Sequence, residues 1–242
     1  MKHNYKIREM LLLAEGVFQT QVNNPIQKHM DVDIIKLKAK RNYFKVKRII
    51  DIIGSGLGII VLIPIYLLVA LAIKIENPKG PIIFTQTRVG LNGKIFKMYK
   101  FRSMMVNAED YLSDLWEQND MDGLMFKMKE DPRVTPVGKI IRKFSLDELP
   151  QLYNVLIGDM SLIGPRPPLV YEYQEYNDYH KQRLLVQPGC SGRWQVTGRN
   201  EVTFDEMVEM DIKYINSISL KQDIVLILKT ISVMVFPKND TW

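Results

Sequence analysis

Two adjacent carboxylates, Asp147 and Glu148, stand in the run Ser145-Leu146-Asp147-Glu148-Leu149-Pro150-Gln151, downstream of the only long apolar run in this chain of 242 residues. Neighbouring acids suit catalysis or cation binding, whereas a protein that merely binds polyanions has no need of them. A water-soluble carboxylate site combined with one apolar segment indicates chemistry at a membrane surface. One reactant would come from water and the other from the lipid phase.

The same two acids also have a purely structural interpretation. Apolar residues at helical spacing (Leu149, Leu152, Val155 and Leu156) predict a helix that begins at the dyad. Pro150 belongs in a first turn, which favours Asp147 or a close neighbour as the cap. Ser145 and Glu148 also match a capping box, but a Ser145 cap places Pro150 beyond the free first turn. The local residues leave both interpretations open.

Cations suited to phosphate surround the dyad. They are Arg133, Arg142, Lys143, Arg166, Arg193 and Arg199. An arginine in a loop can grip phosphate oxygens with two parallel hydrogen bonds, although ordinary solvated charge is the alternative for each. Arg166, held between Pro165 and Pro167, is the strongest candidate because a rigid turn presents its guanidinium.

The element that must bring this site to a membrane is residues 52–73, which carry no charged residue across 22 positions. That length spans the hydrocarbon core as a helix. Pro64 near its middle predicts a bend. Both flanks are basic, so the distribution of positive charge favours neither orientation, and we expect residues 46–75 to form a re-entrant helix rather than a spanning one. The flanking cations are Lys36, Lys38, Lys40, Arg41, Lys45, Lys47 and Arg48 before it, and Lys74, Lys79, Arg88, Lys94, Lys97, Lys100 and Arg102 after it.

The remaining pattern predicts an α+β fold that is mainly helical. Residues 82–89 and 94–101 form a β-hairpin, residues 104–118 a helix, and residues 212–236 amphipathic helices that lie on the membrane. We expect three regions: an N-terminal extension of unknown role (1–45), the membrane helix (46–75) and a small cytoplasmic catalytic domain (76–242). One cysteine, Cys190, and three scattered histidines exclude a disulfide framework and make a histidine metal cluster improbable.

Several stretches resemble the bacterial sugar transferase family, the monotopic phosphoglycosyl transferases. They are Lys100-Phe101-Arg102-Ser103-Met104, Asp131-Pro132-Arg133-Val134-Thr135, Ile141-Arg142-Lys143-Phe144-Ser145-Leu146-Asp147-Glu148-Leu149-Pro150-Gln151-Leu152, Gly158-Asp159-Met160-Ser161-Leu162-Ile163-Gly164-Pro165-Arg166-Pro167 and Gly198-Arg199-Asn200. The resemblance covers roughly residues 43–236 in the family's order. Residues 1–42 lie outside it and lack the four spanning helices of the family's longer members.

The resemblance implies transfer of a sugar-1-phosphate from a UDP-sugar to polyprenyl (undecaprenyl) phosphate, with release of UMP. This is the first membrane step of capsule, exopolysaccharide or glycoconjugate assembly, at the cytoplasmic face of the bacterial inner membrane among its lipids. By carry-over Asp147 is the nucleophile that forms an aspartyl-phosphosugar intermediate, and Glu148 is its metal-associated partner, with Mg²⁺ held by both acids.

The resemblance also assigns the cations. Lys100 and Arg142 face the phosphates and Arg166 holds the uridine side, while Arg102, Arg133 and Arg199 are further substrate-binding candidates. Asp159 is a weaker metal candidate, for which a turn-capping role is favoured. The family commonly has Ser before the membrane proline, where this chain has Ile63, so the kink lacks a hydroxyl that could bond a freed backbone carbonyl. No nucleic-acid partner is expected, and a homodimer is possible.

Two other functions remain open on the sequence. A membrane phosphohydrolase could use the same carboxylate with water as the acceptor, and a non-catalytic basic scaffold could bind anionic lipid. Labelled UDP-sugar distinguishes them, because only the transferase passes label from Asp147 to lipid phosphate.

Overall fold

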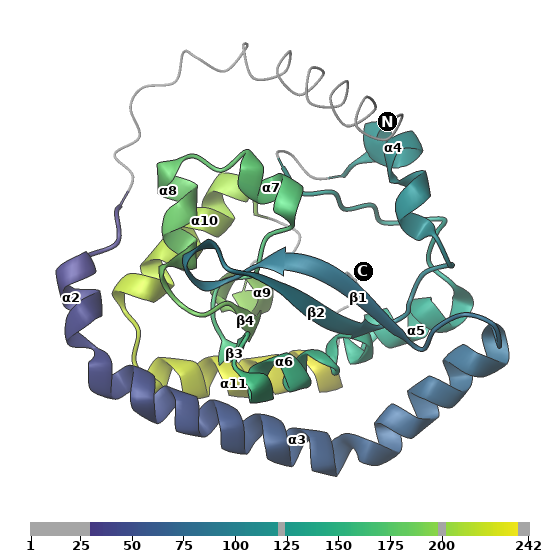
Figure 1. Ribbon diagram of the computed structural model, residues 1–242, viewed down its shortest axis with the longest axis horizontal. Coiled ribbons are helices and arrows are strands. Elements are labelled where there is room, and N and C mark those ends of the chain that lie inside the picture. The colour runs from purple at the N-terminus through teal and green to yellow at the C-terminus, as the bar shows by residue number, and fades with distance from the viewer. Residues whose placement is uncertain (1–29, 121–123, 198–201, 237–242) are drawn as a thin grey trace.

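The computed structural model describes residues 30–120, 124–197 and 202–236, and Figure 1 shows the arrangement of their elements. The helices are α2 (Ile34–Ala39), α3 (Arg41–Glu76), α4 (Leu112–Leu115), α5 (Pro136–Lys143), α6 (Gln151–Ile157), α7 (Val170–Gln174), α8 (Asp178–Lys181), α9 (Arg193–Thr197), α10 (Phe204–Asn216) and α11 (Leu220–Val235). The strands are β1 (Ile83–Val89), β2 (Ile95–Phe101), β3 (Ser161–Ile163) and β4 (Gly189–Ser191). Short 3₁₀ turns η1 to η5 occupy Leu91–Gly93, Ala108–Tyr111, Trp116–Gln118, Leu146–Glu148 and Gln182–Leu185. The described part is therefore mainly helical, as expected.

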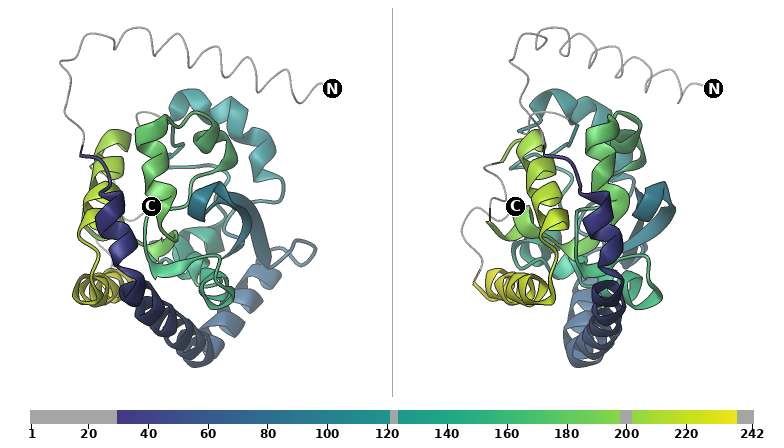
Figure 2. Two further views of the ribbon diagram at one scale, coloured as in Figure 1. Left: turned by 60° about the vertical axis from the view of Figure 1, so that its left-hand side comes forward. Right: turned by 90° about the vertical axis from the view of Figure 1, so that its left-hand side faces the viewer.

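The long helix α3 contains the apolar segment and continues through Pro64. It changes direction part-way along its length (Figure 2), as expected where a proline removes one backbone hydrogen bond. In the described part of the chain, α3 is the one helix that is long and apolar enough to cross a membrane. It begins at Arg41, a few residues before the predicted start at 46.

The predicted hairpin is confirmed. β1 and β2 are antiparallel, with Ile83 opposite Phe101 and Val89 opposite Ile95. The connection turns through Asn92 and Gly93, whose φ angles of 54° and 81° lie in the left-handed region that Gly and Asn tolerate best. A second, parallel pair was not predicted: β3 lies beside β4, with Ser161 opposite Gly189. This pairing brings Cys190 and its neighbours next to the segment that follows α6.

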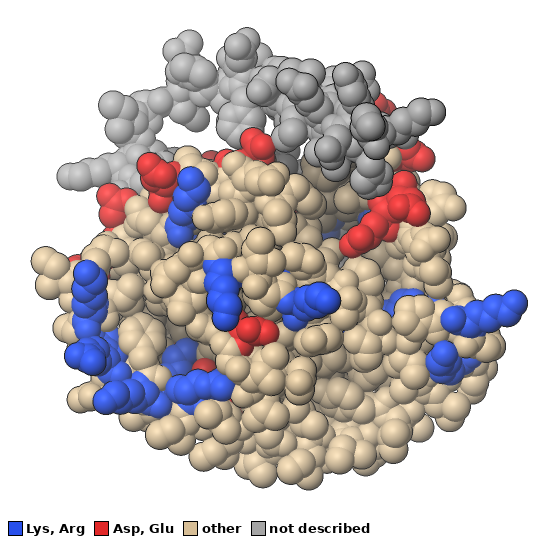
Figure 3. Space-filling model, in the orientation of Figure 1, with Lys and Arg blue, Asp and Glu red and all other residues tan. Residues whose placement is uncertain are grey.

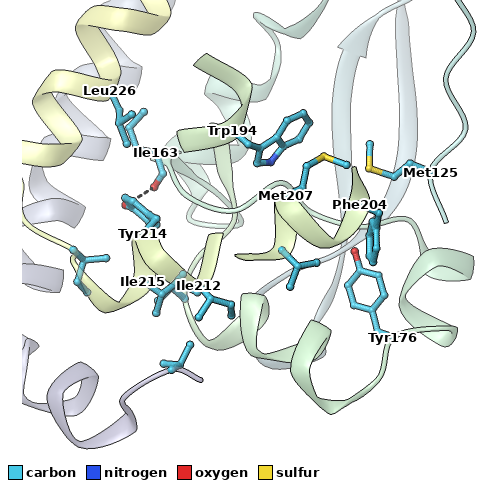
Figure 4. Close-up of a cluster of buried hydrophobic side chains, with 14 residues drawn as sticks. Met125, Ile163, Tyr176, Trp194, Phe204, Met207, Ile212, Tyr214, Ile215 and Leu226 are labelled. Atoms are coloured by element: carbon cyan, nitrogen blue, oxygen red, sulfur yellow. Dashed lines mark hydrogen bonds between the residues drawn. The ribbon is translucent and has the colours of Figure 1, made fainter. Parts of the chain in front are cut away.

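The largest hydrophobic core gathers around α10. Figure 4 shows Trp194, Phe204, Met207 and Met125 at one end, and Tyr214, Ile163 and Leu226 at the other. The Tyr214 hydroxyl donates to the Ile163 carbonyl at 3.4 Å, which links α10 to β3. This core joins the part of the chain that follows the dyad to Val32 and Met125, which precede it.

A layer of apolar helices forms the lower edge of the molecule in Figures 1 and 2. It consists of α3, α6 and α11; α6 packs directly on α3. Many of its large apolar side chains are exposed: Ile49, Ile52, Ile53, Leu57, Ile60, Val61, Ile63, Leu67, Leu68, Leu71 and Ile75 on α3, Ile157 on α6, and Ile224, Val225, Leu228, Ile231 and Val235 on α11. Figure 3 shows the same edge as a broad area without charged residues. An exposed apolar face of this extent marks an interaction surface.

Two predicted helices were placed wrongly. Residues 104–118 do not form one helix, because Met104 bridges to Val134 and Asn107 has a left-handed φ of 63°, so only short turns follow. The helix at the dyad begins at Gln151, not at Asp147. Asp147 and Glu148 lie in the 3₁₀ turn η4, and Ser145, with a φ of 54°, makes no side-chain cap. The capping-box interpretation therefore fails as well.

Candidate active site

The dyad lies in a cavity of about 740 Å³ between the hairpin, α5, the turn at Arg166 and the apolar layer. Its polar lining includes Arg88, Lys100, Lys127, Asp131, Arg133, Arg142, Asp147, Glu148 and Arg166. Its apolar lining comes largely from α3, α6 and α11, and includes Gly54, Gly58, Leu62, Leu152, Ile227, Ile231 and Met234. One continuous space thus joins a charged region to the exposed apolar layer.

The turn η4 is held by contacts with α3. Leu146 and Leu149 pack with Val69 and Ile73 of α3. The Tyr66 hydroxyl, also from α3, donates to the Leu149 carbonyl at 2.6 Å. The bent helix α3 therefore positions the segment that carries the two acids.

The two acids have opposite electrostatic surroundings. Burial raises the pKa of Asp147 to about 6, although Lys100 and Arg142 act in the other direction. Burial also works against the charge of Glu148, but the Lys100 ammonium, 2.6 Å from its Oε1, outweighs it and lowers the pKa of Glu148. Near neutral pH Glu148 is ionised, and Asp147 is an anion that remains basic for a carboxylate. A basic, weakly solvated carboxylate is suited to nucleophilic attack.

The cavity carries more positive than negative charge. Among the described residues, six cations and three carboxylates line it, an excess of three positive charges. Arg142, at the end of α5, donates from Nε to the Ser103 hydroxyl at 3.2 Å, while Arg166 is half-buried in its Pro-Arg-Pro turn. This excess fits a ligand with several negative charges, such as a diphosphate.

The sequence of the chain is similar to those of known proteins. The family model for bacterial sugar transferase matches residues 42–237. The chain belongs to the bacterial sugar transferase family. It is 50% identical over 198 residues to the galactosyl transferase CpsE of Streptococcus agalactiae, covering 81% of this chain and 43% of that protein. It is 43% identical over 206 residues to the undecaprenyl-phosphate galactose phosphotransferase of Salmonella typhimurium, covering 81% and 42%.

A shorter relative is covered more fully. The exopolysaccharide production protein ExoY of Sinorhizobium fredii is 40% identical over 189 residues, which is 76% of this chain and 83% of that protein. The chain spans less than half the length of CpsE and of the galactose phosphotransferase.

The structure brings only some of the predicted binding residues of this chain together. Lys100, Arg133, Arg142 and Arg166 line the cavity with the dyad. Arg133, however, is bonded to both carboxylate oxygens of Asp131, at 2.9 and 2.7 Å, so its charge is already paired. Arg199 lies outside the described residues.

Two predicted site residues lie away from the cavity lining. Arg102 was expected to bind substrate, but it does not line the cavity. It donates from Nη2 to the carbonyls of Ile73 and Asn77, at 3.4 and 3.3 Å, and so satisfies carbonyl groups at the end of α3. Arg102 follows the last residue of β2, so its side-chain direction is set by its bonds to the end of α3 rather than by the strand that carries Lys100. Asp159 follows α6 outside the lining, where its backbone N–H donates to the Asn154 carbonyl at 2.9 Å.

The sequence interpretation missed Arg88 as a site residue, counting it only among the basic flanks. In the structure Arg88 is buried in the cavity wall. The sequence held one signal for it: Gln86 and Arg88 are alternate residues of β1, so their side chains share one face of the strand.

Proposed function

We propose that this chain transfers a sugar-1-phosphate from a UDP-sugar to polyprenyl phosphate and releases UMP. The supporting observation is one cavity in which buried Asp147 lies beside the Glu148–Lys100 pair, between an excess of cations and the apolar walls of α3 and α11. The names of the relatives, which include an undecaprenyl-phosphate galactose phosphotransferase, provide the acceptor and the group transferred.

The chemistry proceeds in two displacements. A carboxylate oxygen of Asp147 attacks the phosphorus that bears the sugar, and the bond from that phosphorus to the UMP oxygen breaks. An anionic oxygen of polyprenyl phosphate then attacks the same phosphorus, and the bond to Asp147 breaks, which restores the carboxylate. Lys100, Arg142 and Arg166 neutralise the charge that accumulates on phosphate oxygens. Two steps allow reactants from different phases to bind in turn.

The donor set fits Mg²⁺. This ion commonly binds through one or two carboxylates together with substrate phosphates, and Asp147 and Glu148 supply two carboxylates in the cavity. Within the described ranges, no group of three His, Cys, Asp or Glu residues forms a complete protein cage, so substrate oxygens would complete the coordination. The bound ion would supply charge neutralisation at the diphosphate.

The bonds of α3 support re-entrant insertion. Its first half is bonded to the catalytic domain through Lys47 and Asp51, and its second half through Tyr66 and Glu76, whose Oε1 accepts from the Val137 N–H at 2.9 Å. Both ends of the bent helix therefore belong to one folded body, which a spanning helix would separate. Exposed Lys36, Lys38, Arg41 and Lys45 would bind anionic headgroups at the cytoplasmic face.

The function is tested with the full chain in detergent and a panel of UDP-sugars labelled in the sugar. We expect UMP release, transient label on Asp147 seen by intact-mass spectrometry, and transfer of label to polyprenyl phosphate, all abolished by EDTA and restored by Mg²⁺. Label that passes to water in the presence of acceptor would identify a phosphohydrolase instead.

Topology has a separate test in intact cells. Single cysteines placed at Lys38 and Lys79, with Cys190 replaced by Ser, should both resist a membrane-impermeant thiol reagent applied from outside. Labelling of one position alone would indicate a spanning helix.

A further inference from the structure

Arg88 is a buried cation with an unusual set of partners. It lies on β1 in the cavity wall and is 5% exposed. Its guanidinium donates to the Pro167 carbonyl at 3.0 Å and to Gln86 Oε1 at 3.1 and 2.6 Å. All of these acceptors are neutral.

Among the residues that the structure describes, no carboxylate lies within 4.0 Å of this guanidinium. Glu148 and Glu172 are the acids that act on it from further away. Glu148 is paired with Lys100, and Glu172 accepts from the Leu169 N–H at 2.8 Å. Arg166, a second cation, adds repulsion.

Such an arrangement is unfavourable for the free protein. A buried charge without an opposite charge in contact loses solvation that neutral hydrogen bonds only partly replace. Burial, with a further contribution from Arg166, lowers the pKa of Arg88 to about 9, so it remains charged at neutral pH. An anion that enters the cavity would remove this penalty.

We propose that Arg88 binds the diphosphate of the nucleotide-sugar donor and, through Pro167, orients the Arg166 turn toward the same group. This inference rests on the proposed function and extends it to a residue outside the expected set. A guanidinium can donate two parallel hydrogen bonds to phosphate oxygens. The cavity lining also carries an excess of positive charge, which a diphosphate would neutralise.

The experiment compares binding of UDP and of uridine to the full chain in detergent by calorimetry, for the unaltered protein and for Arg88→Met. We expect UDP affinity to fall about tenfold or more, as for loss of a charge-assisted hydrogen bond, and uridine affinity to change less than about twofold. Lys97→Met is the matched control, because it removes an exposed cation from the same hairpin outside the cavity lining. It should leave UDP affinity unchanged.

A second variant separates the charge from a structural role. Arg88→Lys keeps the charge and should recover part of the UDP affinity that Arg88→Met loses. A lysine variant as weak as the methionine variant would overturn direct binding, as would an Arg88→Met protein that binds UDP like the unaltered chain. If the unaltered chain itself fails to bind UDP, the proposed function fails, and this inference fails with it.

Discussion

Two buried arginines, in two regions of the molecule, show what the cavity wall does differently from the core. Arg183, beside α10, is 3% exposed and contacts Asp211 Oδ2 from Nε at 2.8 Å and from Nη2 at 2.7 Å, while its Nη1 donates to the Tyr176 hydroxyl at 2.8 Å. Burial opposes its charge, but Tyr176 and Asp211 outweigh burial and raise the pKa of Arg183. Arg88 is similarly buried, but its partners within the described part of the chain are all neutral.

The difference concerns which charges the protein itself neutralises. In the core, Arg183 meets the carboxylate of Asp211, so this pair is part of the fold. In the cavity wall, Arg88 retains unfavourable surroundings that an anionic substrate can relieve, and buried Asp147 remains a basic carboxylate. We therefore expect substitutions in the wall to impair the reaction more than the fold, and substitutions in the core to do the opposite.

The largest effect is expected from Asp147→Asn. Transfer and the covalent adduct should be lost, by ~10³-fold or more, because the nucleophile is gone.

The same variant should also change the stability of the fold. The folded pKa of Asp147, about 6, exceeds the ordinary value of 3.8, so ionisation of Asp147 destabilises the fold as pH rises through this window. The variant should therefore be more stable at pH 7, by up to about 3 kcal/mol, and no more stable near pH 4. Activity assays and thermal melts at both pH values measure this, with Asp159→Asn as the control; a less stable variant at pH 7 contradicts it.

In the core, Arg183→Met should act in the opposite direction. It leaves Asp211 buried without its cation, a change that costs about 3–5 kcal/mol. The melting temperature should fall by roughly 6–20 °C, at about 2–4 °C per kcal/mol. The double variant, Arg183→Met with Asp211→Leu, should recover most of the lost stability, because no buried charge is then left unpaired. A double variant as unstable as Arg183→Met would show that the loss does not come from the unpaired charge of Asp211.

Lys100→Met tests the cavity wall through pH. Lys100 lowers the pKa of both acids, so without it both values rise. The acid limb of the transfer rate, expected near pH 6 in the unaltered chain, should move to higher pH, and activity at neutral pH should fall. A pH–rate profile of the first step, measured as UMP release, provides the test. If the acid limb of the Lys100→Met variant stays at the same pH, ionisation of Asp147 does not control the rate.

The smallest effect is expected from Tyr66→Phe. It removes one hydrogen bond to the Leu149 carbonyl, worth about 1 kcal/mol, while the ring contact with Phe101 remains. The rate constant should fall several-fold with little change in the UDP-sugar requirement, because η4 is held less firmly. Tyr153→Phe, at a half-exposed ring on α6, is the comparison. Equal rate constants in Tyr66→Phe and Tyr153→Phe would show that α3 does not position the dyad through this bond.

Local patterns predicted the hairpin, the apolar helix with its internal proline, and the amphipathic helices at the end of the chain. They failed between residues 104 and 118 and at the dyad, where Asn107 and Ser145 adopt left-handed conformations that helical spacing does not reveal. For the site, the motifs identified Lys100, Arg142 and Arg166 beside the dyad, but they also included Arg102, and Arg88 was considered only as a basic flanking residue. Which of these points into the cavity depends on strand register and on the packing of α3.

The chain's residues alone thus determined the family, the dyad and the single apolar segment, because these follow from residue type and short-range spacing. The three-dimensional structure decided which charges are neutralised within the protein. It paired Arg183 with Asp211, used Arg102 to satisfy the end of α3, and left Arg88 in the cavity wall facing only neutral groups. The physical reason is that the burial and partners of a charge depend on contacts between segments far apart in sequence, which no local pattern encodes.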